Sequence, residues 1–211
     1  MPDSAREQGL AEIALCESVL AKGGLNVLSA LFRGVSSIGA FDHYPPGDVF
    51  DPASNAQWYY HCHPATEDSV EHGHFHCFMR PQGPDGPIHH LLAIGVDPEG
   101  RLLRLFTVNQ WVVGDDWADA EATIPLLSRF DVQMPQPSYL VNRWLTAIFV
   151  AGAAGLHIFW AWVAPGRRPG ADFSFWTSLT GTSGQITQVW EGFGVVAVSR
   201  ARGDVDHTSM T

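Results

Sequence analysis

Histidines are concentrated in one short stretch of the chain. The sixteen residues from His61 to His76 include five histidines, and eight of the chain's ten histidines lie between His43 and His90. Imidazole is the commonest transition-metal ligand among side chains, and its ordinary pKa is the one nearest to neutral pH. The stretch therefore predicts a metal site, or a site for acid–base or nucleophilic chemistry, in preference to a merely polar surface strand.

Two strands joined by a hairpin loop are expected to carry this cluster. Residues 57–63 are rich in aromatic side chains, and residues 71–79 alternate histidines with small or apolar residues. Both patterns are typical of strands. Residues 64–70 contain a proline and polar side chains, as expected of a loop. Because side chains two residues apart on a strand share a face, the histidines at 72, 74 and 76 are expected to lie together.

The pairing register of the two strands decides whether they form one histidine face. If residue 63 pairs with 72, then 61 pairs with 74, and all five histidines face the same side. A shift of one residue would turn one set to the opposite face. We expect the first register, because it leaves Trp58, Phe75 and Cys77 on the other face, where they can join the core.

The histidines of this face are the candidate metal ligands. They exceed the three or four ligands that most metal sites need, and cross-strand proximity favours the first four of the set: His61, His63, His72, His74 and His76. A shell rich in imidazole and poor in thiolate suits a transition metal such as zinc, iron or copper. Four protein ligands would make a structural site, whereas three ligands and an open position would make a catalytic one.

Three residues are candidates for catalysis: His74, Glu71 and His43. Glu71 is expected to point away from the histidines in this register, so its expected role is a salt bridge or a contact behind a ligand. His43 lies in a loop rich in proline, glycine and aspartate, which can bring it to the site. His89 and His90 are adjacent, so only one of them can face the cluster. Nearby aromatic side chains suit a pocket for a small organic substrate.

Composition limits the classes of protein and partner. A chain of 211 residues with 45% hydrophobic residues can bury a core of its own. The net charge of −10 argues against a nucleic-acid partner, which requires a basic face. Three cysteines form no even disulfide framework, and the polar N-terminal residues do not resemble a signal peptide. We therefore expect a cytoplasmic protein that acts on a small molecule.

The rest of the chain indicates an α+β fold with a small antiparallel sheet packed against N-terminal and C-terminal helices. Apolar spacing predicts helices at 4–21 and 25–33, a helix at 117–130 broken at Pro125, and a further helix that Ser138 caps. Residues 41–56 are expected to be a loop. Strands are expected at 57–63, 71–79, 88–96 and 101–108.

Residues 144–164 allow two interpretations. They carry no formal charge and are long enough to span a bilayer, with Arg167 and Arg168 following. The favoured interpretation is a helix buried on all sides, since its glycines and alanines allow close packing. We expect residues 1–150 to form a single histidine-rich α+β domain. Residues 151–211 are expected to form a divergent apolar helix and tail.

Several motifs resemble an uncharacterised bacterial family, which is a domain of unknown function. The likeness rests on residues 41–51, 57–63 and the Glu71-His-Gly-His-Phe-His76 motif with its continuation to Arg80, followed by residues 107–117 and 136–144. The motifs occur in matching order over about residues 5–150. The resemblance implies no activity, so the chemistry has to come from the residues.

A second, local resemblance covers about ten residues. Ser69 to Phe78 is similar to the His-x-His-x-His signature of the histidine-triad nucleotide hydrolases. The resemblance implies that His74 would be the nucleophile that attacks a phosphate. Three functions therefore stay open: a metal-dependent enzyme, which we favour, a metal-binding or metal-sensing module without turnover, and a nucleotide phosphoramidase.

Overall fold

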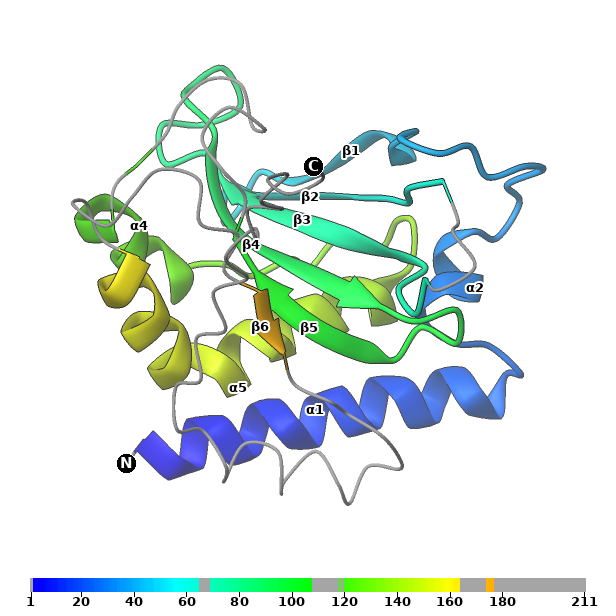
Figure 1. Ribbon diagram of the computed structural model, residues 1–211, viewed down its shortest axis with the longest axis horizontal. Helices are drawn as coiled ribbons and strands as arrows, with labels where there is room; N and C mark the ends of the chain where they lie inside the picture. The colour runs from blue at the N-terminus through cyan, green and yellow to red at the C-terminus, as the bar shows by residue number, and fades with distance from the viewer. Residues whose placement is uncertain (1, 65–68, 108–117, 119, 164–173, 177–211) are drawn as a thin grey trace, which may run out of the picture.

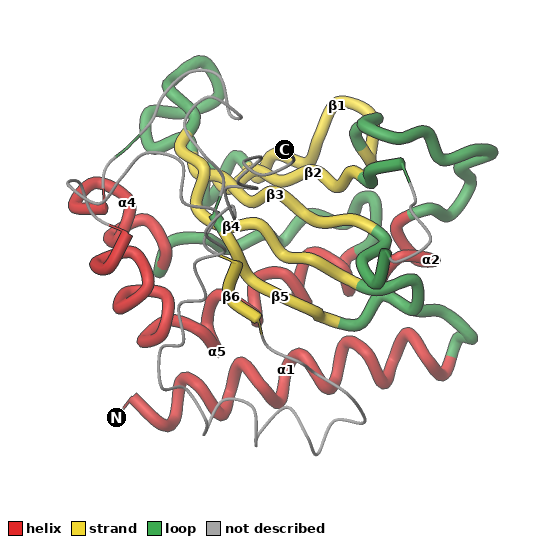
Figure 2. Tube along the Cα trace, in the orientation of Figure 1, coloured by secondary structure: helices red, strands yellow, loops and turns green. Residues whose placement is uncertain are grey.

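The computed structural model describes residues 2–64, 69–107, 118, 120–163 and 174–176. A six-stranded sheet occupies its centre, and every neighbouring pair of strands is antiparallel in the order of the chain. The strands are β1 (Tyr44–Asp51), β2 (Ala56–His61), β3 (Gly73–Met79), β4 (His89–Val96), β5 (Leu102–Phe106) and β6 (Ser174–Trp176). The helices are α1 (Pro2–Lys22), α2 (Val27–Leu31), α4 (Ala120–Leu127) and α5 (Tyr139–Val163). The predicted α+β class is confirmed (Figures 1 and 2).

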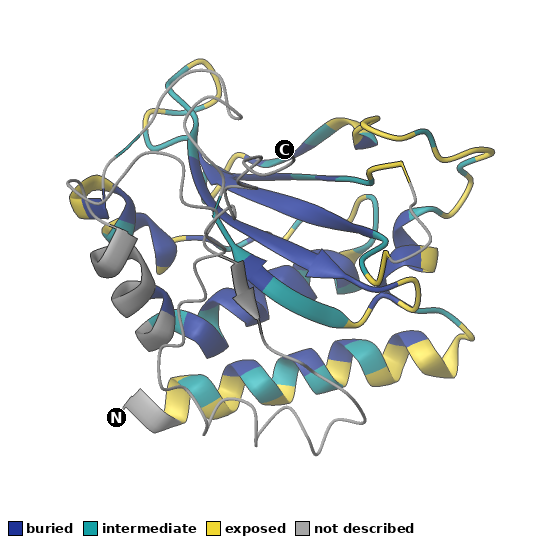
Figure 3. Ribbon diagram, viewed as in Figure 1, coloured by how far each residue is buried: buried dark blue, intermediate teal, exposed yellow. Residues whose placement is uncertain are grey.

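One face of the sheet belongs to the hydrophobic core. Trp58, Phe75 and Cys77 are fully buried there, as their alternation predicts. The Phe75 ring lies edge-on to Trp58, with centroids 5.5 Å apart, and 6.0 Å from the ring of Trp144 on α5. The middle strands are accordingly the most deeply buried part of the sheet (Figure 3). The alternate residues of the same strands are left for the opposite face.

Helices α1 and α5 pack closely enough to require glycine at their crossing. A Cβ atom on Gly9 would lie 2.5 Å from the backbone nitrogen of Ala151, so no larger residue fits without moving a helix. A hydrogen bond from Trp144 Nε1 to Glu17, 2.9 Å long, also joins the two helices. The side chains of Leu145 and Ile148 are buried in the core. Among the described residues, no helix combines the length and apolar character that a membrane crossing requires.

Two local predictions are wrong. Residues 41–56 were expected to be a loop, but β1 fills half of this range as the edge strand. Its two prolines are tolerated because an edge strand needs only one row of ladder hydrogen bonds. The expected break at Pro125 is absent, since α4 continues through this residue to Leu127.

Helix α5 crosses the expected domain boundary at residue 150 without interruption. The division into residues 1–150 and 151–211 stays a prediction. Residues 164–173 and 177–211 of the expected tail lie outside the described part of the chain.

Candidate metal centre

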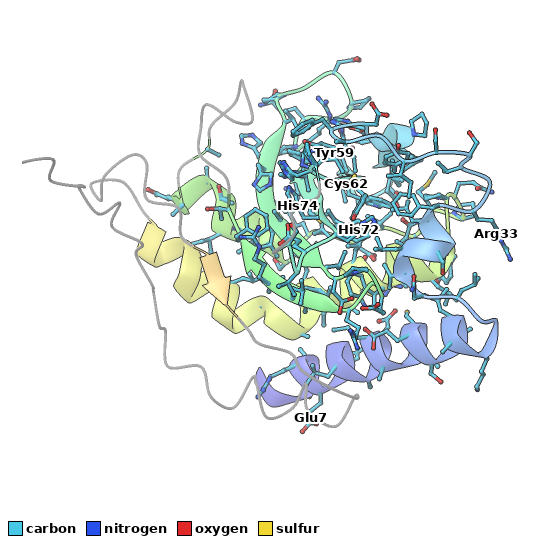
Figure 4. All side chains as sticks on the ribbon, turned by 45° about the vertical axis from the view of Figure 1, so that its right-hand side comes forward. Glu7, Arg33, Tyr59, Cys62, His72 and His74 are labelled. Carbon is cyan, nitrogen blue, oxygen red and sulfur yellow. The ribbon has the colours of Figure 1, made fainter. Side chains whose placement is uncertain are left out.

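The β2–β3 hairpin has the register that the histidine pattern predicts. His61 pairs with His74, Tyr60 with Phe75 and Tyr59 with His76. His61, His74 and His76 therefore project from the face opposite the core. His74 and Tyr59 are labelled on this hairpin in Figure 4.

His61, His74 and His76 are close enough together to hold a metal ion. Each offers one ring nitrogen, and these three atoms lie within 4.8 Å of one another. The Nε2 atoms of His61 and His74 are 2.9 Å apart. In a tetrahedral site with metal–nitrogen bonds near 2.05 Å, two ligand nitrogens lie about 3.3 Å apart and two ring centroids about 5.2 Å apart. The three observed centroid separations are 4.6, 4.9 and 4.8 Å, so small movements would complete the geometry.

Glu71 lies on this histidine face, contrary to the prediction that it points away. Its carboxylate accepts a hydrogen bond from His74 Nδ1 at 2.8 Å and forms an ion pair with Arg104 on β5. A Cβ atom on Gly95 would be 2.5 Å from Glu71 Oε2, so the glycine leaves room for this carboxylate. With Nδ1 of His74 engaged, its Nε2 is directed to the cluster, as is common behind metal-bound histidines.

His72 lies on the other face, so the predicted five-histidine face is wrong at this position. Its Nδ1 atom is 2.6 Å from the hydroxyl of Tyr60, a core residue. The reason is that β3 begins only at Gly73, so alternation does not constrain the residue before it. A Cβ on Gly73 would collide with Tyr60 and the His61 carbonyl, so only glycine lets the backbone at residue 73 lie this close to β2. We therefore do not retain His72 as a ligand.

The structure adds His90 to the site. Cys77 pairs with Leu92, but Phe78 pairs with His90, so β4 holds one extra residue at this point. Such a bulge shifts the alternation and turns His90 onto the histidine face. Its Nε2 atom is 3.0 Å from Nδ1 of His76. The adjacent His89 and His90 in the sequence indicated that one of the two could face the cluster. The bulge that places His90 there could not be predicted from the sequence.

His43 lies beside the cluster, next to Tyr59. The two rings stack with centroids 3.6 Å apart, and the His43 ring is 6.4 Å from that of His61. Its Nδ1 atom is 3.0 Å from Asp48 Oδ1, while the other oxygen of Asp48 accepts a hydrogen bond from Gln57. Asp48 has a left-handed φ of 59° in the irregular part of β1, and this turn brings its carboxylate back to His43.

His63 completes the group on the exposed side. It lies two residues beyond the end of β2, and its ring centroid is 5.0 Å from that of His61 and 5.2 Å from that of His74. The side chain is exposed, whereas His74 and His76 are only 5% and 2% exposed. The exposed Phe41 contacts the His63 ring edge-on.

Burial favours the neutral form of the His61 and His76 imidazoles. Burial lowers the pKa of His61 to about 3, with further lowering by neighbouring histidines, and burial also puts the pKa of His76 well below its ordinary value. Burial would raise the pKa of Glu71, but hydrogen bonds from His74 and Arg104 outweigh it and lower that pKa. A neutral imidazole with an ionised carboxylate behind it is the form that binds a metal.

Metal-free protein should lose stability in mild acid. Burial, followed by electrostatic coupling to the nearby His74, lowers the pKa of His90 from 6.5 to about 3 in the folded state. Below pH 6.5, His90 becomes protonated in the unfolded chain, whereas in the folded protein it becomes protonated only near pH 3. Stability should therefore fall as the pH drops through this window, by at most about 1.4 kcal/mol per pH unit for this histidine.

Urea unfolding between pH 7.5 and 5, after chelator treatment, measures this effect. His90→Gln should flatten the dependence, while His89→Gln, at the neighbouring position, should not. Equal slopes for His90→Gln and the unmodified protein would contradict the account.

Comparison with known proteins identifies a family but no function. A family model described as "Domain of unknown function (DUF6969)" matches residues 7–158. Neither the curated proteins nor the solved structures include a match to this chain. The expectation of an uncharacterised family, based on the order of the motifs, is confirmed.

Proposed function

The chain belongs to this family of unknown function. From the geometry of the histidine site we propose that the protein binds one transition-metal ion and uses this ion to act on a small organic substrate. His61, His74 and His76 would be the ligands. The observation that carries the proposal is that their three ring nitrogens lie within 4.8 Å of one another.

The chemistry of the donors supports a transition metal. All three donors are imidazoles, two of them buried, and the shell contains no thiolate. This set favours zinc, iron or copper over magnesium or calcium, which prefer oxygen ligands. Glu71 behind His74 and His90 behind His76 would fix both rings and direct their outer nitrogens to the ion. The site therefore has both ligands and the groups that orient them.

Three protein ligands leave a position for substrate, which supports catalysis. A bound metal would polarise a substrate or activate a water molecule there. His43 is placed to move a proton, because Asp48 holds its Nδ1 and its side chain is 44% exposed beside the cluster. Tyr59 and Phe106, whose rings contact the cluster histidines, supply apolar surface for an organic substrate.

The phosphoramidase alternative has less support. A nucleophilic His74 would need a ring nitrogen open to a phosphate, but its side chain is buried and both nitrogens have partners, Glu71 and His61. A metal-binding module without turnover differs from the enzyme only in lacking an exchangeable coordination position.

Elemental analysis tests the proposal. Protein prepared without an affinity tag or chelator should carry about one first-row transition-metal ion per chain. Removing the metal should lower the melting temperature, because binding to the folded state alone stabilises it. Metal-free protein that neither holds nor takes up such an ion would overturn the proposal. Hydrolysis of a nucleoside phosphoramidate in the presence of chelator would favour the alternative.

A further inference from the structure

One histidine beside the proposed site, His63, differs from the three ligands because it does not lie on a paired strand. His61, His74 and His76 lie on paired strands, where ladder hydrogen bonds fix their backbone. His63 lies two residues beyond His61, outside the ladder, on the same side of the sheet as the other three. The cluster therefore combines three ligands on a rigid frame with one on the segment that leaves it.

The ring of His63 lies at the separation expected for a shared ion from two of the three ligand rings, those of His61 and His74. Two imidazoles on one tetrahedral ion have ring centroids about 5.2 Å apart. The His63 centroid lies 5.0 Å from that of His61 and 5.2 Å from that of His74. A small rotation of the side chain would direct a nitrogen of His63 to an ion held by the other three.

Among the residues that the structure describes, few interactions hold the side chain of His63 in place. Within the described residues, its ring nitrogens make no hydrogen bond, and its contacts are with neighbouring rings. The segment is attached at Cys62, whose carbonyl accepts a backbone hydrogen bond from Phe41, 2.8 Å long, and whose Sγ donates to the Gly39 carbonyl at 3.7 Å. Phe41 is itself 58% exposed and has a left-handed φ of 67°, a costly conformation for an aromatic residue.

We propose that His63 is an exchangeable fourth ligand, which closes the coordination shell at rest and is displaced by a donor atom of the substrate. This inference rests on the proposed metal site. It identifies the substrate class as small molecules with an oxygen, nitrogen or sulfur donor able to replace an imidazole. It also makes the exposed side of the cluster, next to Phe41, the side from which substrate enters.

Azide binding to the Co²⁺-loaded full-length protein tests the inference. In the unmodified protein azide has to compete with His63, whereas in His63→Ala the position is open. If His63 occupies the position in nine molecules of ten, the apparent azide affinity of the variant should be about tenfold higher. Visible absorption of the cobalt ion reports both the coordination geometry and the azide titration. Added imidazole should return the spectrum of His63→Ala to that of the unmodified protein. His89→Ala provides a control that also removes one histidine.

The outcomes separate this inference from the proposed function. One Co²⁺ per chain in both proteins, with tighter azide binding to His63→Ala, supports the inference. Equal azide affinities at full metal content would overturn it and leave the metal site standing. Loss of the metal in a folded His63→Ala protein would also overturn it, because His63 would then be a permanent ligand. Absence of Co²⁺ binding by the unmodified protein would contradict the proposed function itself.

Discussion

Replacing His61 and His74 together by alanine should abolish metal binding. The two Nε2 atoms lie 2.9 Å apart across the hairpin, and their removal leaves only His76 of the three closest donors. The stabilisation that the metal supplies should vanish with it. For an ion present at a thousand times its dissociation constant, that stabilisation is about 4 kcal/mol. Metal content after dialysis and the melting temperature with and without added metal measure both effects.

His72→Gln is the matched control for this double variant. His72 adjoins the cluster in sequence but contacts Tyr60 on the core side, so the variant should keep its metal. Loss of metal in His72→Gln with retention in the double variant would show that the ligand set is wrong.

Replacing Asn142 by leucine should strongly destabilise the fold without touching the histidines. Asn142 is fully buried on α5, where its Oδ1 accepts a hydrogen bond from Trp58 Nε1 at 2.9 Å. Its amide nitrogen donates to the carbonyls of Met134 and Gln136, at 2.6 and 3.0 Å. Leucine has a similar volume but leaves all three partners unsatisfied, at about 1–3 kcal/mol for each buried group. We expect a loss of about 3–5 kcal/mol in the free energy of unfolding.

Urea unfolding checks this expectation, with Gln136→Ala as the control. The Gln136 side chain is exposed, and only its backbone carbonyl bonds Asn142, so the control should change stability by less than about 0.5 kcal/mol. Similar stabilities for Asn142→Leu and Gln136→Ala would contradict the structural role assigned to Asn142.

The hairpin could be predicted because two independent signals agreed. Alternation of apolar residues required Trp58 and Phe75 to face the core, and the same register paired His61 with His74. One strongly patterned hairpin was thus enough to bring three histidines together. The small antiparallel sheet and its flanking helices followed from similar periodic patterns.

The predictions that failed depended on where regular structure stops. The alternation of side chains between the two faces of a sheet does not extend beyond the end of a strand. Glu71 and His72 lie just before β3, and each is therefore found on the face opposite to the one predicted. The bulge in β4 that selects His90 is a departure from alternation, which a periodic pattern cannot reveal. The pairing of Asn142 with Trp58 joins residues far apart in the chain, so no local pattern indicates it.

X-ray absorption at the metal edge of the purified protein would identify the atoms bound to the ion. We expect one transition-metal ion with a nearest shell of nitrogen at about 2.0–2.1 Å and the outer scattering of at least three imidazole rings. The same spectrum should disappear in the His61 and His74 double variant. A shell of oxygen or sulfur, or fewer than three imidazoles around the ion, would contradict a metal centre built on His61, His74 and His76.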